Sequence, residues 1–303
     1  MNKKLAILFF LLCLSMSRIW SLEIELGGGI GNLTFDKDLK TALSDPTIEG
    51  TFDPELYPLI LARFSAEYES LLFNAGFKRE PLLRNMLYGN LRAGFDFFYI
   101  EAGPVIGLFN SSKLPINPGL SAALGFSIPG IIFIEAGASS TIGSRNDTTG
   151  NYTWISGDLS AGFWVPHVIC SLNMRVKNFT GREEKNLLIE DNCKRYFFRA
   201  DVYTKNIQFT IKVDFGFQNL GRYYTTQKID NNDLVIDESK DIFKSLFAGI
   251  EASYTVNSMI KFYLGAEMPV YSWGVRPMKD PPKNKMLFEA RMGIILNFAK
   301  RTD

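Results

Sequence analysis

Apolar and polar residues alternate with a period of two along most of the chain beyond residue 22. In the segment 207–217 (IQFTIKVDFGF), every odd-numbered residue is aliphatic or aromatic, whereas the even-numbered residues are Gln, Thr, Lys, Asp and Gly. The segments 259–268 and 286–298 repeat this alternation. Because successive side chains of a strand point to opposite faces, the pattern predicts β-strands with one apolar face and one polar face.

The alternation predicts about fourteen strands, and it leaves the count open between 12 and 16. The least certain boundary is near residue 68, where Glu67-Tyr68-Glu69 must form a tight turn. Single-chain bacterial barrels have even strand counts, which favours this turn. The expected strands are 22–34, 58–67, 69–77, 86–95, 98–109, 119–128, 131–143, 152–163, 167–177, 195–203, 206–218, 244–255, 258–270 and 286–298.

Short and long connections alternate between the expected strands. The short ones lie near 95–97, 128–130, 165–167, 204–206 and 256–258. The long, polar ones are 36–57, 78–85, 110–118, 144–151, 179–194, 219–243 and 271–285. This asymmetry predicts an all-β fold in which residues 22–303 form a single closed antiparallel up-and-down barrel, with short periplasmic turns and long extracellular loops. No dedicated plug precedes the first strand, and the acidic segment 219–243 is the best candidate for a loop that folds inward.

Charged residues fall on the polar face of the expected strands. A barrel of this width has an interior that holds water, so ionised groups inside it stay hydrated while the apolar face meets lipid. A soluble β-sandwich with buried, paired carboxylates remains the alternative. The candidate lumen-lining charges are Arg63, Glu67, Arg92, Asp96, Glu101, Glu135, Asp158, Arg175, Arg199, Asp201, Lys212, Asp214, Glu251, Lys261, Glu267, Glu289 and Arg291; Glu23, Glu25 and Lys177 share that face.

Aromatic residues gather near the ends of the expected strands, as in the interfacial girdles of membrane barrels. They are Tyr57, Tyr88, Tyr152, Trp154, Phe163, Trp164, Tyr254, Tyr271, Trp273 and Phe298. With the alternation, the asymmetric connections and a last strand ending in Phe298, the chain resembles bacterial outer-membrane β-barrel proteins, in style the small porin-like barrels of spirochaetes. The resemblance implies insertion by the barrel-assembly machinery, although Ala299 to Asp303 follow the terminal aromatic residue.

The N-terminal segment has the features of an export signal. Lys3 and Lys4 precede the apolar run 5–14, which is too short to cross a bilayer, and Ser21 is a plausible cleavage position. We therefore expect residues 1–21 to be a cleaved signal peptide and the protein to reside in the outer membrane. Cys170 and Cys193 remain beyond the signal, too few for a disulfide framework.

Candidate chemistry is sparse. Lys plus Arg number 33 against 32 Asp plus Glu, which gives no electrostatic case for nucleic acid. The single histidine, His167, lies in a short turn, and a pair with Ser171 lacks a third partner, so we expect no enzyme and no catalytic residues. One histidine and two cysteines predict no metal site, and GGGIG at 27–31 lacks the helix of a dinucleotide loop, so no cofactor is expected.

The function that this pattern favours is a porin-like passive channel for small hydrophilic solutes. Among the polar-face charges, twelve acids stand against eight bases, which suggests a mild preference for cations. One alternative is an occluded barrel whose loops bind a surface or host ligand; another is a soluble secreted β-protein. Outer-membrane lipid and the solute itself are the other expected partners.

Overall fold

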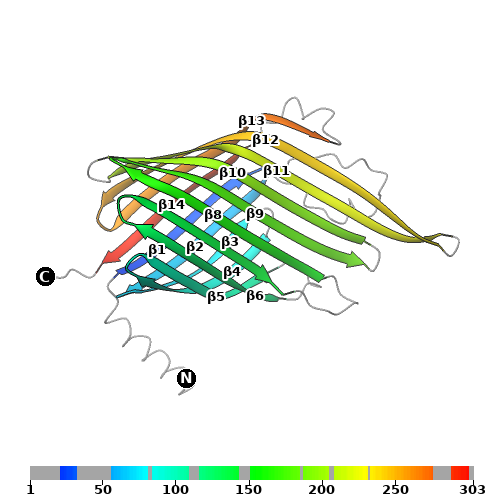
Figure 1. The fold of residues 1–303 in the computed structure, drawn as a ribbon, viewed down its shortest axis with the longest axis horizontal. Coiled ribbons are helices and arrows are strands. Elements are labelled where there is room, and N and C mark those ends of the chain that lie inside the picture. The colour runs from blue at the N-terminus through cyan, green and yellow to red at the C-terminus, as the bar shows by residue number, and fades with distance from the viewer. Residues whose placement is uncertain are drawn as a thin grey trace, which may run out of the picture.

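The computed structural model describes residues 21–32, 56–80, 84–108, 116–142, 151–184, 187–204, 208–230, 233–275 and 288–299. These residues form fourteen antiparallel strands in one closed up-and-down barrel, as predicted (Figure 1). The strands are β1 (Ser21–Gly31), β2 (Tyr57–Tyr68), β3 (Leu71–Glu80), β4 (Arg84–Phe95), β5 (Phe98–Leu108), β6 (Asn117–Ile128), β7 (Ile132–Thr141), β8 (Asn151–Val165), β9 (Val168–Glu184), β10 (Leu187–Tyr203), β11 (Phe209–Asp230), β12 (Asp233–Asn257), β13 (Ile260–Val275) and β14 (Glu289–Ala299). The predicted signal segment lies outside the described residues except for Ser21.

Pairing of the first strand with the last closes the barrel. Leu22 of β1 is in register with Ala66 of β2 on one side and with Phe298 of β14 on the other. Every strand therefore has two hydrogen-bonded neighbours and no edge is left open, which is what a strand needs in a solvent that cannot hydrogen-bond. The start of β1 and the end of β14 lie at the same end of the barrel, here called the short-turn end (Figure 1).

Tight turns join strands at the short-turn end. The β2–β3 turn contains Glu69 at φ 53°, which confirms the predicted turn, and the β8–β9 turn contains His167 at φ 66°. Gly130, between β6 and β7, adopts φ 77°. Positive φ at one central residue lets a two- or three-residue connection reverse the chain, and the Pro166 that precedes His167 fixes the other half of that turn.

Strands β9 to β12 extend further than the sequence predicts, β11 to 22 residues and β12 to 25, and this corrects two expected loops. The described residues of segment 179–194 belong to the end of β9 and the start of β10, and those of segment 219–243 belong to the end of β11 and the start of β12. Asp230 pairs with Asp233 at the tip of the β11–β12 hairpin. The hairpin projects past its neighbours, away from the short-turn end (Figure 1), so it is not an inward-folded plug.

The outer face of the barrel is a belt of exposed apolar side chains. Leu124, Leu172, Leu264 and Met292 are each at least 60% exposed, and such residues recur on all sides of the ring. On β10 to β13 the belt ends at a register row of Lys194, Asn219, Lys244 and Trp273. A continuous apolar surface of this extent is typical of contact with lipid and foreign to a soluble monomer. None of the described residues forms a helix long and apolar enough to cross a membrane.

Part of the predicted aromatic girdle is confirmed, and the other part lies in the interior. Phe163, Tyr254, Tyr271, Trp273 and Phe298 are exposed on the outer face. Tyr57 and Trp154 are buried inside instead, and Tyr88 packs beside Trp154. Trp164 lies against Phe133 in the interior, with ring centroids 5.0 Å apart and ring planes inclined at 57°. The sequence shows that an aromatic residue lies near a strand end. Whether its side chain faces the outside or the interior depends on whether it shares the odd or even positions of the outward residues of its strand.

Glycines on the inner face leave room for tyrosine rings. Gly27 of β1 and Gly293 of β14 lie opposite each other, and Tyr263 of β13 is the next residue in the same row. A Cβ at either glycine would overlap the Tyr263 ring. The first glycine of the GGGIG run therefore makes space in the barrel interior: the Tyr263 ring of β13 lies over the glycine backbone of β14 and β1.

Candidate functional site

The interior of the barrel carries a set of ion pairs that joins most of the predicted lumen charges. Arg63 contacts Glu23 and Glu25 at 2.6 and 2.9 Å. Other pairs are Arg92–Glu101 at 2.8 Å, Arg175–Asp158 at 2.6 Å, Arg199–Asp214 at 2.7 Å, Arg195–Glu267 at 2.5 Å, and Lys212 and Arg291 with Glu251, both at 2.9 Å. Each base lies opposite an acid on its own or a nearby strand, so the interior is polar without being strongly charged.

The remaining predicted residues lie towards the short-turn end or lack a printed ion pair. Asp96 is not in a strand but in the turn between β4 and β5, and Glu67 and Glu135 are exposed near the same end. Lys261 lies near the start of β13, and Asp201 is in register with Lys212. Glu289 accepts a hydrogen bond from the Tyr57 hydroxyl at 3.4 Å and is in register with Glu267. Glu67, Asp96 and Glu135 therefore make the short-turn mouth acidic, whereas Glu289 begins β14 and lies towards the other end.

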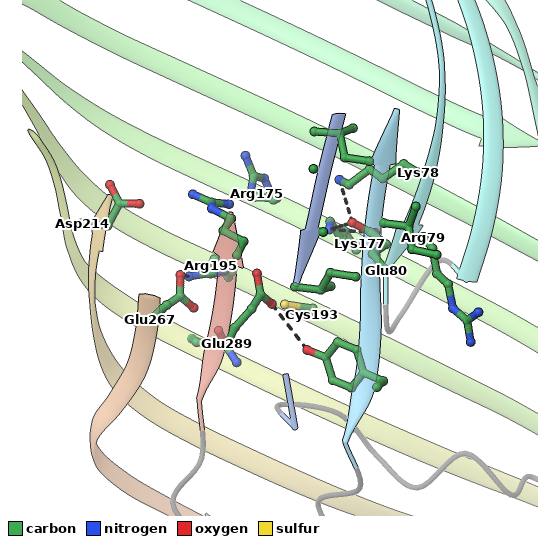
Figure 2. A pocket seen from close by; sticks show the side chains of 18 of the residues that line it. Lys78, Arg79, Glu80, Arg175, Lys177, Cys193, Arg195, Asp214, Glu267 and Glu289 are labelled. Carbon is green, nitrogen blue, oxygen red and sulfur yellow. Dashed lines mark hydrogen bonds and ion pairs between the residues drawn. The ribbon is translucent and has the colours of Figure 1, made fainter. Parts of the chain in front are cut away.

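One ion pair crosses the barrel. Lys177 of β9 donates to both carboxylate oxygens of Glu80 of β3, at 2.7 and 2.8 Å, and Lys78 contacts the same carboxylate at 2.7 Å (Figure 2). β3 and β9 are six strands apart in a ring of fourteen, so they stand on nearly opposite walls. Glu80 and Lys177 are each the tenth residue of their strand. Their contact divides the interior at that level into two sectors.

At the level of this contact, the sector bounded by β3 to β9 is filled with apolar side chains, and it is called the filled sector. Val105 of β5, Trp154 of β8 and Phe179 of β9 are buried, and Met86 and Tyr88 of β4 pack against them. The backbone N–H of Trp154 donates to the Thr141 hydroxyl at 3.0 Å. These side chains pack together as in a protein core, whereas the same strands carry the partly exposed Arg92–Glu101 and Arg175–Asp158 pairs nearer the short-turn end.

The other sector, formed by β9 to β14 and β1 to β3, contains a cavity of about 200 Å³. Its walls carry Tyr57, Arg175, Lys177, Arg195, Glu267 and Glu289, of which Figure 2 labels all but the tyrosine. Arg195 of β10 pairs with Glu267 of β13, three strands away in the ring. The Arg195 guanidinium lies 4.1 Å from the centre of the Phe247 ring. Phe197 in turn contacts Phe247 edge-on at 6.0 Å. This cavity sector is polar and large enough for water or a small solute.

The two cysteines do not form a disulfide. Cys170 is in register with Ala200, seven residues along β10 from Cys193, which corresponds to roughly 23 Å of strand. That separation is far beyond the Cα distance of a disulfide, and the odd spacing puts the two side chains on opposite faces. Cys193 was expected in a loop; it is instead buried inside β10 and lines the cavity.

The residues considered for catalysis or metal binding have other neighbours. The His167 ring lies edge-on to Tyr203 at 5.8 Å in the short-turn region. The Ser171 hydroxyl accepts a hydrogen bond from the Asn173 side-chain amide at 2.9 Å. Within the described ranges, no group of three or more His, Cys, Asp and Glu residues could hold a metal ion.

Sequence reasoning missed several residues of the interior. Lys78 and Glu80 were assigned to a loop, as were Asp191 and Arg222, which form a buried bidentate pair at 2.6 and 2.8 Å. The signal was available, because each continues the parity of its strand's inward residues. The strands were ended too early, at the point where their outer face becomes polar.

No protein-family model matches the chain, and no curated protein is significantly similar to it. Among solved structures, outer-membrane-expressed OmpT of Vibrio cholerae is 9% identical, with 92% of this chain and 97% of that chain covered and a TM-score of 0.43. OmpF of Salmonella typhi in complex with daunomycin is 9% identical, with 92% and 97% covered and a TM-score of 0.36. The deltaS2S3 mutant of TodX, a monoaromatic hydrocarbon channel, is 7% identical, with 92% and 90% covered and a TM-score of 0.38. At these values the likeness is one of general architecture.

Proposed function

We propose that this protein is an outer-membrane β-barrel that forms a passive channel for small hydrophilic solutes. The observation that carries the proposal is the inverted distribution of side chains in a closed barrel: apolar groups cover the outside and ion-paired groups cover the inside. Lipid as the outer solvent and water as the inner one account for both faces at once. A soluble secreted protein would expose the whole apolar belt to water.

The cavity sector is the proposed route. Its walls hold charged groups and the Tyr57 hydroxyl, and its cavity has a volume of about 200 Å³. A passage of this size suits small solutes and excludes folded or polymeric ones. The proposal assigns the chain no catalytic role and no cofactor.

Planar-bilayer recording tests the channel. Purified protein, inserted from detergent, should produce discrete conductance steps in potassium chloride. Cell fractionation should recover it with the outer membrane, and unheated samples should migrate faster on gels than boiled ones. Insertion confirmed by heat-modifiable migration, together with conductance no higher than in protein-free bilayers, would remove the channel proposal.

A second candidate is an occluded barrel that displays the β11–β12 hairpin. Two observations favour it: the Glu80–Lys177 contact already closes part of the interior, and β11 and β12 continue beyond their pairing with β10 and β13. Under this function, shortening the hairpin would abolish binding of a surface partner while the barrel stays folded. The absence of conductance in intact, inserted protein would favour this candidate.

A further inference from the structure

The bases of the interior ion pairs lie over the acids. Arg291 is 48% exposed whereas its partner Glu251 is 13% exposed. Lys78 is 40% exposed over Glu80 at 6%, and Arg92 is 34% exposed over Glu101 at 12%. Lys212 covers Glu251 in the same way. The reason is side-chain length: a carboxylate stays close to the wall, and the longer Lys or Arg extends past it towards the water.

We propose, on the basis of the channel function above, that the cavity sector binds and selects small anions that carry a carboxylate or phosphate group. Lys78, Arg199, Lys212 and Arg291 border this sector and are each more exposed than the carboxylate they pair with, so a solute meets these cations before their acids. The guanidinium donors of Arg291 suit two-oxygen acceptors such as phosphate and carboxylate, whereas the fork of Arg199 is taken by both oxygens of Asp214. The substrate class therefore differs from the cation preference that counting acids and bases suggests.

The acidic short-turn mouth does not reverse this preference. Glu67, Asp96 and Glu135 are exposed there, where bulk salt screens them over about 8–10 Å. Selection in a pore is made where solute and wall are closest, which here is the cavity beside the Glu80–Lys177 contact. Three pairs do not follow this order of base over acid: Arg195 and Glu267 are equally exposed at 17% and 18%, Arg222 and Asp191 are both buried, and Asp158 is 53% exposed against 38% for Arg175.

Two cations can be removed without leaving an acid unpaired. Glu80 keeps Lys177 when Lys78 is lost, and Glu251 keeps Lys212 when Arg291 is lost. The double variant Lys78→Gln/Arg291→Gln should therefore fold. In water, a unit charge about 8 Å from the solute path changes the local anion concentration roughly twofold. Removing both cations should therefore lower that concentration about fourfold. Lys194→Gln is the matched control, because it removes one positive charge from the outer face.

Reversal potentials across a potassium chloride gradient give the permeability ratio of chloride to potassium. We expect a ratio above one for the wild type, a fall of about fourfold in the double variant and no change in Lys194→Gln. A conducting protein with a ratio of one or less, or a double variant that keeps the wild-type ratio, overturns the anion proposal and leaves the channel intact.

Calorimetric titration of the barrel in nanodiscs with inorganic phosphate decides the case if no conductance is found. Phosphate binding that weakens about fourfold in the double variant and is unchanged in Lys194→Gln supports the anion site even though the channel function has failed. No phosphate binding, or equal binding in all three proteins, overturns it.

Discussion

The filled sector and the cavity sector lie side by side in one barrel, and their inward side chains occupy the enclosed space differently. Between β3 and β9, the wall-to-wall space is closed by Trp154, Phe179 and their apolar neighbours. On the other side, the space is lined by ion pairs and retains a cavity. The Glu80–Lys177 pair stands on the boundary between them. The comparison indicates that strand count sets the circumference, while the inward side chains decide how much of the enclosed space is open.

The largest expected effect comes from the filled sector. Trp154→Ala removes a buried ring that contacts opposite strands, so unfolding in urea from lipid vesicles should become easier by about 3–5 kcal/mol. Trp273→Ala, on the exposed outer face, is the matched control and should cost clearly less. Equal losses for the two variants would show that the filled sector is not a packed core.

The boundary pair comes next. Glu80→Gln leaves Lys177 and Lys78 without their shared carboxylate in a buried position, which should cost about 3 kcal/mol in the same unfolding measurement. Asp158→Asn removes the acid of an exposed pair and should cost at most about 1 kcal/mol. Replacing both residues, Glu80→Gln with Lys177→Gln, should recover part of the loss. If the double variant instead showed the plain sum of the single losses, the cross-barrel contact would carry no coupling energy.

The period-two pattern predicted the strands correctly inside the apolar belt, but it did not predict how far they continue beyond the belt, away from the short-turn end. Within the belt, lipid demands apolar residues on one face and the lumen favours polar ones on the other, so the alternation is strong. Beyond the row of Lys194, Asn219 and Lys244, the outer face leaves the apolar belt and the contrast disappears, although the hydrogen-bond ladder continues. Strand ends predicted from hydropathy therefore marked the edge of the membrane belt, and the ends of β9 to β12 were missed.

The division of the interior had no signal in the sequence. Parity places Glu80 and Lys177 on the inner face, but the two residues are 97 positions apart and their strands are not neighbours. Whether opposite walls touch depends on how the ring is flattened and on the volumes of Trp154 and Phe179, which is a property of packing. The same limit explains why counting inward charges suggested cation preference: a count does not tell which charge lies in front.

The smallest effect on the barrel is expected from the tip of the β11–β12 hairpin. β11 pairs with β10 only as far as Thr226, and β12 pairs with β13 only from Ile242, so residues 227–236 are held by the hairpin alone. Thr226 and Asp237 are directly opposite, so Asn-Gly in place of 227–236 closes the shortened hairpin with a two-residue turn.

This shortened protein should keep heat-modifiable migration and its conductance, and its unfolding free energy should change by less than about 1 kcal/mol. The physical reason is that the boundary pair, the apolar filling and the cavity walls all lie nearer the short-turn end than the tip does. A tip deletion that lowers conductance while leaving migration unchanged would mean that the hairpin contributes to the solute path, and the boundary between filled and cavity sectors would then have to extend into it.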